Sequence, residues 1–494
     1  MTGAAGPGEA VKDGTKAGVT VRPAQLRGLA RRLRGGLLLP GHPEYETARR
    51  VYNGMIDRHP AVIVRCAWRG DVVAAVEFAR EHSLPVAVRG GGHNVAGNAV
   101  CDGGLVIDLS PMKGIRVDAG ARTARADPGL TWGEFDRATQ AAGLATTGGF
   151  ISTTGIAGLT LGGGLGWLMR RHGLACDNLI GAEVVTADGH VVCAGGHERE
   201  ELLWGLRGGG GNFGVVTAFE YRLHPVGPVT AGTIAYPMAR ARDVLRFYRD
   251  YLAGAPDELG TSLALSTSSD GEAIVHAVVC HCGPLEAGES LMRPLLSLGP
   301  PLAADVRARP YLEVQRLSDA GFPFGLLNYW KSAFLRDLSD EAIEAAVACF
   351  AGVPSPRTIA VLEHLGGAVA RAGNDDTAFA HRDRRYNFSI VSMWTDAAQT
   401  EANVAWTRRF WEVMERYAAD AVYVNYLGDE GQDRIVAAYG PAKYARLVAL
   451  KHAYDPTNVF RFNQNIAPRP LEPPSPAARR PRAGLQGEGR QGGG

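Results

Sequence analysis

Residues 85–94 read Pro85-Val86-Ala87-Val88-Arg89-Gly90-Gly91-Gly92-His93-Asn94, a short β-rich run followed at once by a glycine cluster. The run predicts a strand, and the glycines end it. Backbone without Cβ atoms can approach a ligand closely, and successive N–H groups can bind phosphate oxygens. This segment therefore predicts a strand end that borders a ligand site.

Two further glycine clusters follow, one at 148–166 and one at 208–214. A single cluster could be a set of tight turns, but three of them favour a diphosphate-containing ligand. Gly209, Gly211 and Gly214 also fit the G-x-G-x-x-G spacing. The residues after Gly214 alternate as in a strand, whereas a dinucleotide-binding turn leads into a helix. A Rossmann fold is therefore excluded, and no P-loop string occurs.

Short strands and helices alternate around these clusters. Strands are predicted at 61–64, 85–88, 105–108, 182–186 and 190–193, a hairpin at 115–126, and helices at 71–81 and 131–142. Asp71 is the predicted N-cap of the first helix, and the second begins at Thr131. This pattern predicts an α+β domain over 41–225.

The pattern changes after residue 226, where the predicted strands become longer. They lie at 262–266, 273–280, 358–362 and 387–393, and the helices between and after them lie at 243–252, 339–350 and 402–417. This order is typical of an antiparallel sheet with helices packed on one face. A β-rich run at 422–426, a helix at 441–454 and an irregular segment at 455–466 follow. The last is expected to pack on the first domain.

Composition excludes several classes of protein. The 52 basic and 51 acidic residues give a net charge of +1 with no basic stripe, so no nucleic-acid partner is expected. Seven scattered cysteines make a poor disulfide framework and show no zinc-site spacing, so no metal is expected. No apolar run is long enough for a signal peptide or a membrane span, and a cytoplasmic protein is expected. The 494 residues suggest two or three domains.

Several motifs occur in an order typical of one flavoprotein family. They are 89–94, His172-Gly173-Leu174-Ala175-Cys176-Asp177-Asn178, 207–216 and the C-terminal string 454–462. Over about residues 45–467 the chain resembles the berberine bridge enzyme-like oxidases of the vanillyl-alcohol oxidase/p-cresol methylhydroxylase (PCMH) superfamily. The resemblance implies a two-lobed, PCMH-type FAD-binding domain at 41–225, completed by 430–467, and a substrate domain of helix-covered antiparallel sheet at 226–429. Residues 1–40 would be a tail and lead-in, and 468–494 a disordered tail.

The resemblance implies an FAD held by two covalent bonds. His93 would bond through its ring to the flavin 8α-methyl carbon, and Cys176 through sulfur to C6. Without the family context, a turn histidine and a buried core thiol are the simpler interpretations. The other residues expected at the cofactor are Arg89, Gly90, Gly91, Gly92, Asn94, Thr153, Thr154, Gly155, Gly158, Thr160, Gly163, Gly166, Val216, Asn463 and Asn465.

The substrate side is expected to hold a base for the hydroxyl proton. The family places a tyrosine of a Y-x-N-Y string there, which here reads Tyr423-Val424-Asn425-Tyr426. Tyr426 is the expected base and Tyr423 a further candidate, although a structural phenol on a strand is the alternative. A tyrosine has a pKa of about 10, so neighbours would have to lower the pKa of Tyr426. Glu363 could lower that pKa or replace the tyrosine, or be a solvated strand-end carboxylate.

Two other positions carry expectations. Leu179, three residues after Cys176, corresponds to a family site that borders the space where oxygen meets reduced flavin. A large residue there favours slow oxygen use. The run 382–385 is expected to be a surface charge cluster.

The resemblance implies oxidation of an alcohol or hemiacetal carbon of a sugar or secondary metabolite by hydride transfer to the flavin. Electrons would then pass to O2 or to another acceptor. Two alternatives stay open: an oxidative ring-closing or desaturating enzyme of natural-product biosynthesis, and a flavin-binding protein without turnover. No motif fixes the substrate or the oligomeric state.

Overall fold

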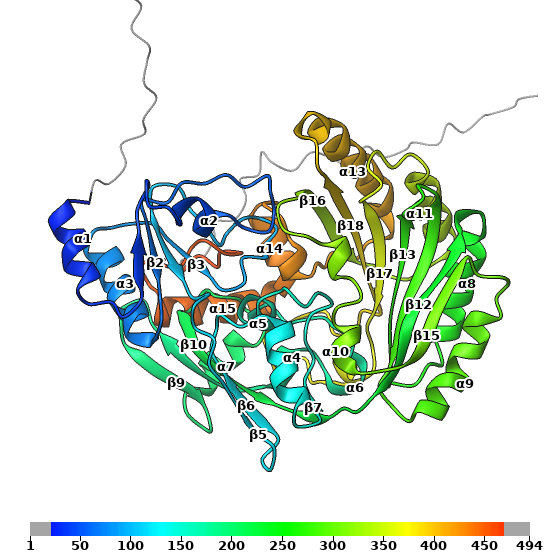
Figure 1. Cartoon of the computed structure of the whole chain (residues 1–494), viewed down its shortest axis with the longest axis horizontal. Helices are drawn as coiled ribbons and strands as arrows, with labels where there is room; N and C mark the ends of the chain where they lie inside the picture. Colours follow the sequence, from blue (N-terminus) through cyan, green and yellow to red (C-terminus); the bar gives the residue numbers. More distant parts are fainter. Residues whose placement is uncertain (1–20, 469–494) are drawn as a thin grey trace, which may run out of the picture.

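The structure, a computed structural model, describes residues 21–468 (Figure 1). Its first sheet has the strand order β1-β2-β4-β3, with β1 at Gly36–Leu38, β2 at Val62–Arg65, β3 at Val86–Arg89 and β4 at Leu105–Asp108. The strands β2 and β3 both run parallel to β4, with Arg89 opposite Asp108. The predicted strand therefore ends at the glycine cluster, at the carboxyl edge of a parallel sheet.

Helix α3 (Arg69–Glu81) packs against this sheet but begins earlier than expected. Its N-cap is Trp68, so Asp71 lies inside the first turn. The buried Asp71 carboxylate instead accepts hydrogen bonds from the backbone N–H groups of Arg34 and Ala67, at 2.8 Å each. The predicted N-cap is wrong because the Asp71 carboxylate accepts hydrogen bonds from the backbone N–H groups of neighbouring loops.

A five-stranded sheet follows, in the order β5-β6-β10-β8-β9. Its strands are β5 (Ile115–Asp118), β6 (Thr123–Ala126), β8 (Leu179–Val185), β9 (Val191–Gly195) and β10 (Val215–Arg222). Every neighbouring pair is antiparallel. Because Gly214 leads directly into β10, the exclusion of a Rossmann turn is confirmed.

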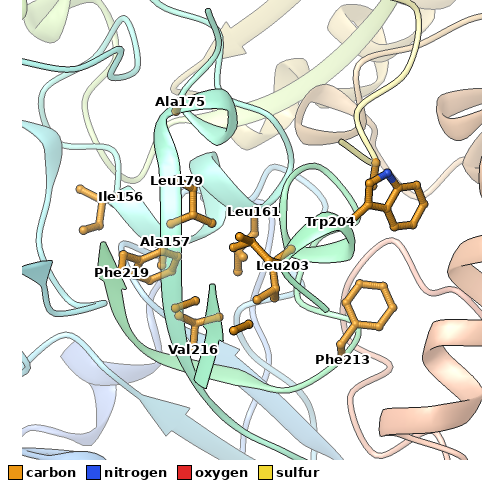
Figure 2. Packing of buried hydrophobic residues seen from close by; sticks show 14 of the residues in the cluster. Ile156, Ala157, Leu161, Ala175, Leu179, Leu203, Trp204, Phe213, Val216 and Phe219 are labelled. Atoms are coloured by element: carbon orange, nitrogen blue, oxygen red, sulfur yellow. The ribbon is translucent and has the colours of Figure 1, made fainter. Parts of the chain in front are cut away.

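The main core of this half lies between the five-stranded sheet and the helices α4 (Trp132–Gln140), α5 (Ile156–Leu161) and α7 (Glu200–Leu206). Figure 2 shows Leu161, Leu179 and Phe219 among the side chains that fill it. The C-terminal residues Leu447 and Ile466 belong to the same cluster. The prediction that the irregular end of the chain packs back on the first half is confirmed.

The second half is built on a seven-stranded antiparallel sheet, as predicted. The strand order is β15 (Ala303–Arg309), β12 (Val229–Pro237), β14 (Ala273–His281), β13 (Leu259–Thr267), β17 (Ile359–His364), β18 (Tyr386–Trp394) and β16 (Leu327–Phe334). Four helices cover one face (Figure 1): α8 (Ala241–Leu252), α9 (Leu285–Leu296), α11 (Asp340–Phe350) and α13 (Thr400–Met414). The mixed α+β class with a helix-covered antiparallel sheet is confirmed.

Strand alternation gives the large sheet two different faces. In β17, Ala360 and Leu362 pack in the core beneath the helices. Ile359, Val361 and Glu363 point to the opposite face. That free face is turned toward the glycine clusters of the first half.

The run 422–426 is not a strand. Val424–Tyr426 forms a single 3-10 turn, η6, so the predicted strand alternation of residues 424 and 426 is wrong. The remaining elements are α1 (Pro23–Ala30), α2 (Tyr45–Arg49), β7 (Leu144–Ala145), α6 (Met169–His172), η1 (Cys176–Asn178), β11 (His224–Pro225), η2 (Met238–Arg240), α10 (Tyr311–Val314), η3 (Asp319–Gly321), α12 (Ala368–Arg371), η4 (Ala397–Gln399), η5 (Glu415–Tyr417), α14 (Gln432–Tyr439) and α15 (Pro441–Tyr454).

The predicted C-terminal tail lies outside the described residues except for Pro468, as do the first twenty residues of the predicted lead-in. Across 21–468, no helix combines the length and the apolar character needed to cross a membrane. Within the same range, no cluster of three or more His, Cys, Asp or Glu side chains is arranged to hold a metal ion.

Candidate active site

A cavity of about 360 Å³ lies between the glycine clusters and the free face of the large sheet. A volume of this order is usual for small-molecule sites. Many of the residues singled out in the sequence meet on its wall: Gly90, Gly91, Gly92, His93, Asn94, Thr154, Gly155, Gly158, Val216, Asn463, Glu363, Tyr423 and Tyr426. Segments more than three hundred residues apart in sequence thus form one site.

Two glycine loops cross at the edge of this cavity. A Cβ atom on Gly91 would lie 2.4 Å from the backbone nitrogen of Gly155, and a Cβ on Gly155 would lie 2.5 Å from that of Gly91. Only glycine fits at either position, because the neighbouring backbone cannot move aside. The two loops therefore form a wall of bare backbone of the kind that a diphosphate can approach.

Several polar groups at the cavity have no protein partner within residues 21–468. The backbone N–H groups of residues 91–94 have no acceptor there. The Oδ1 atom of Asn463 and the hydroxyl of Tyr439 are also buried and unpaired, and both residues line the cavity. Buried polar groups rarely stay unpaired in native proteins. These donors and acceptors fit the phosphate, ribityl and ring atoms of an FAD molecule.

His93 presents its ring to the cavity. The ring stacks on Tyr52, with centroids 4.5 Å apart, and meets Phe324 edge-on. Its Nε2 atom lies 3.1 Å from Oγ1 of Thr153, and Nδ1 lies 3.5 Å from Oγ1 of Thr154. Burial lowers the pKa of His93 to about 4, so the imidazole is neutral and keeps a nucleophilic lone pair near neutral pH.

Cys176 is not on the cavity wall. Its side chain has no exposed surface and packs against residues such as Leu165, Met169 and Phe379. Burial, and then the charge of Asp177, raise the pKa of this thiol well above its usual value. A protonated thiol beneath the wall lacks both the access and the ionisation that attack on a flavin carbon requires. The geometry therefore does not support the predicted bond to Cys176.

Leu179 is likewise buried in the main core (Figure 2). It begins β8, its side chain has no exposed surface, and it is absent from the cavity wall. The strand turns this side chain toward α5 and α7, and its role at an oxygen-binding space stays a prediction. Residues 150, 151 and 154 line the cavity in its place.

Other predicted cofactor residues support the wall from behind. The Oγ1 atom of Thr160 lies 2.8 Å from the Tyr221 hydroxyl, and Gly166 lies so close to Gly148 that a Cβ would overlap its carbonyl oxygen. Gly163 and Asn465 also lie outside the cavity lining. Arg89 and Thr153 line a second cavity of about 300 Å³ that shares Gly90 and Gly91 with the first. These residues shape the site without forming its inner surface.

Glu363 is a buried carboxyl group on the cavity wall. Its Oε1 atom accepts a hydrogen bond of 2.7 Å from the Tyr426 hydroxyl, and its Oε2 atom accepts one of 2.7 Å from the Asn387 amide. The side chain is only 2% exposed. Burial raises the pKa of Glu363 to about 7, against the opposing effect of the two donors. Glu363 is therefore not a solvated strand-end carboxylate.

Tyr426 differs from the expectation for a tyrosine base. Burial, and then the nearby charge of Glu363, raise the pKa of Tyr426 well above its usual value. The lowered pKa that a tyrosine base would need is therefore not present, because burial and the neighbouring carboxyl group both favour the neutral phenol.

Tyr423 holds backbone in place. Its hydroxyl oxygen accepts hydrogen bonds from the backbone N–H of Gly164 at 2.9 Å and of Leu165 at 3.3 Å. The Asn425 amide donates to the same oxygen at 2.8 Å. With three donors on one oxygen, this phenol fixes the second glycine cluster.

Sequence reasoning missed several participants. Asn387 gives no signal beyond its place in a β-rich run, and Tyr52 lies in no motif.

The run 382–385 is also not wholly a surface cluster, because Arg382 is 4% exposed. Its guanidinium binds both carboxylate oxygens of Asp177, at 2.5 and 3.0 Å. This ion pair, in which the arginine is buried, fixes the loop that carries Cys176.

Comparison with known proteins agrees with this site. Family models match residues 60–195, described as "FAD binding domain", and residues 422–467, described as "Berberine and berberine like". An FAD-linked oxidoreductase of Dictyostelium discoideum is 34% identical over 88% of this chain and 95% of its own length. The (R)-6-hydroxynicotine oxidase of Paenarthrobacter nicotinovorans is 31% identical over 88% of this chain and 97% of its own.

A solved structure gives the same result. The crystal structure of 6-hydroxy-D-nicotine oxidase from Arthrobacter nicotinovorans superposes with a TM-score of 0.83 and 29% identity, covering 88% of this chain and 98% of that one. Sequence and structure thus agree over nearly the whole length of the relatives. This protein belongs to the berberine bridge enzyme-like family of FAD-linked oxidoreductases.

Proposed function

We propose that this protein oxidises a small molecule in the cavity, with FAD as the hydride acceptor and Glu363 as the proton acceptor. The observation that most supports this is a buried carboxyl group on the cavity wall whose pKa lies at about 7. A group whose pKa lies near the working pH accepts and releases a proton efficiently. FAD, when bound, supplies the hydride-accepting ring.

Glu363 suits the role of base better than Tyr426 does. The phenol keeps its proton, since its pKa is raised and its O–H already donates to Glu363. Together with Asn387, it holds the carboxyl group in one orientation toward the cavity. Each carboxylate oxygen retains a further lone pair that a substrate O–H can use.

The proposed attachment of FAD is a single covalent bond at His93. This ring lines the cavity and is neutral, and its two nitrogens lie near the hydroxyls of Thr153 and Thr154. Those contacts fix the orientation of the imidazole. Cys176 is proposed to remain a free thiol, because its side chain has no exposed surface.

The proposed substrate carbon bears a hydroxyl group, as in an alcohol or hemiacetal of a sugar or a secondary metabolite. Removing hydride from carbon and a proton from oxygen needs one base, which Glu363 provides. The electrons would then pass to O2 or to another acceptor. Oxidative ring closure or desaturation is the second candidate, favoured by the apolar side chains on the sheet side of the cavity.

Anaerobic mixing tests this proposal against a flavin-binding protein without turnover. Protein purified with its flavin is incubated with a set of alcohols, the flavin absorbance is followed, and the product mass is measured. Bleaching of the flavin absorbance, together with a product that has lost two hydrogen atoms from the alcohol, supports the proposal. A flavin that dithionite reduces but no substrate bleaches would favour the binding protein, and a cyclised product would favour the second candidate.

A further inference from the structure

The sheet side of the cavity is mainly aliphatic. Ala264, Val278, Ile359, Val361 and Val391 line it, from four neighbouring strands of the seven-stranded sheet. Their strand neighbours on the opposite face, such as Leu263 and Leu362, pack beneath the helices. These aliphatic side chains form an apolar floor of the cavity, on a sheet face that also carries Ser262, His276 and Glu363.

Aromatic rings border this floor. Phe150 and Trp167 pack edge-to-face with centroids 4.8 Å apart, and Trp330 meets Tyr426 edge-on at 5.6 Å. All four rings line the cavity. Flat aromatic walls around an aliphatic floor favour contact with rings and hydrocarbon skeletons.

Polar side chains on the sheet side are few. Ser262 and His276 lie there, and burial lowers the pKa of His276, so the imidazole is neutral. Its Nδ1 atom is already engaged with the Ser266 hydroxyl at 2.9 Å. Across the described residues of the whole cavity wall, Glu363 is the one side chain with an ionisable carboxyl group, and no Lys or Arg lines it.

A carbohydrate fits this wall poorly. Sugar rings carry a hydroxyl on most carbons, and each one that leaves water must find a new hydrogen-bond partner. The floor offers isolated polar atoms that cannot satisfy such a set. A molecule with one polar group beside Glu363 and an apolar skeleton elsewhere loses no hydrogen bonds on entry.

We infer that the substrate is an apolar, ring-containing compound with one O–H or N–H donor on the carbon that is oxidised. This inference rests on the proposed function; it sets carbohydrates aside and admits an amine in place of the alcohol. The X–H proton passes to the Glu363 carboxylate, the C–H hydrogen leaves with its electron pair to the flavin, and C–X becomes C=X. Both electrons lost by the substrate are gained by the flavin.

The test compares small apolar probes with sugars on flavin-loaded protein under anaerobic conditions. The probes are 1-indanol and 1-aminoindane, and the sugars are D-glucose and cellobiose. Saturable reduction by 1-indanol, 1-aminoindane or both supports the inference, and the faster of the two identifies oxygen or nitrogen as X. Faster reduction by a sugar would overturn the inference and leave the proposed function standing.

Binding distinguishes the remaining outcomes. A saturable change in the flavin spectrum with the indane compounds and not with the sugars, without reduction, supports the substrate class and contradicts the proposed oxidation. No spectral change with the indane compounds at their solubility limit would overturn the substrate class.

An exchange on the floor supplies an independent check. Val361→Thr keeps the side-chain shape and adds one hydroxyl to the apolar surface. It is expected to weaken binding of the indane compounds about tenfold, which corresponds to about 1.4 kcal/mol. Val191→Thr makes the same exchange on the exposed strand β9 and serves as the matched control. Equal affinities in the two variants would contradict an apolar floor.

Discussion

The Tyr426 hydroxyl donates a 2.7 Å hydrogen bond to Oε1 of Glu363, across 63 positions of sequence. The two groups differ in their pKa shifts. The phenol keeps its proton, and the carboxyl group, whose pKa burial raises to about 7, exchanges one near neutrality. In the proposed function, the expected tyrosine base is therefore the residue that orients a glutamate base.

Replacing Glu363 by Gln removes the proton acceptor and keeps the side-chain size. The rate of flavin reduction is expected to fall about 10²- to 10⁴-fold, the usual contribution of a general base. Because the active form is the carboxylate, kcat/KM of the unaltered enzyme should be low well below pH 7 and rise through about 7. This rise of kcat/KM with pH, which we call the pH limb, should vanish in Glu363→Gln.

Glu258→Gln is the control, since Glu258 pairs with Arg171 away from the cavity. It should retain both the rate and the pH limb. An unchanged rate in Glu363→Gln, with normal flavin content, would show that another group accepts the proton.

Tyr426→Phe separates a positioning role from a catalytic one. The hydrogen bond from Tyr426 lowers the pKa of Glu363, so its loss should move the limb of kcat/KM to higher pH and leave activity above the limb largely intact. If Tyr426 were the base, the variant would lose activity at every pH. The full pH profile, measured by stopped-flow flavin reduction, distinguishes the two.

Tyr423→Phe should act on stability rather than on the pH profile. It leaves the buried N–H groups of Gly164 and Leu165 without their acceptor, at a cost of about 1–3 kcal/mol. Urea unfolding should show this loss, while the limb near pH 7 stays in place. A shifted limb with unchanged stability would instead give Tyr423 a part in proton transfer.

Acid should destabilise the fold through a stacked histidine pair. The rings of His172 and His224 lie 3.9 Å apart, and burial, above all, lowers the pKa of His172 to about 3 and of His224 to about 4. An unfolded histidine has a pKa of about 6.5. The stability from this pair is therefore complete above about pH 6.5 and is lost as the pH falls toward 4, because the unfolded chain takes up protons first.

The variant that tests this pair is His224→Gln, whose amide can still reach the Asn178 side chain that His224 contacts at 2.7 Å. Its Tm should fall less between about pH 7.5 and pH 5 than the Tm of the unaltered protein. His197→Gln, at an exposed site, is the control. Parallel Tm curves for both variants and the parent would contradict this effect.

The sequence predicted what local pattern determines. The strand before Gly90 and the alternation that excluded a Rossmann turn depend on neighbouring residues, and both agree with the structure. The failures arise from distant partners. Arg382 binds Asp177 across 205 positions and fixes the Cys176 loop, and no local signal shows that the thiol lies beneath the wall. Motif order alone therefore carries the predictions that Cys176 and Leu179 lie at the ligand.

Dependence on partners distant in sequence also limited the prediction for Tyr426. Its motif predicted that it would lie at the site, which the structure shows, but its pKa is raised by burial and then by the charge of Glu363. That contact forms only when the turn η6 packs against the end of β17. Asn387 was missed for a similar reason, since its role depends on strand pairing opposite Glu363.

Peptide mapping of the acid-precipitated, flavin-loaded protein tests the central claim most directly. The account predicts that the peptide with His93 carries the mass of FAD, and that the peptide with Cys176 carries a free thiol. His93→Ala should release the flavin on precipitation, whereas Cys176→Ala should retain it. Flavin mass on the Cys176 peptide, or complete release from the unaltered protein, would contradict the account.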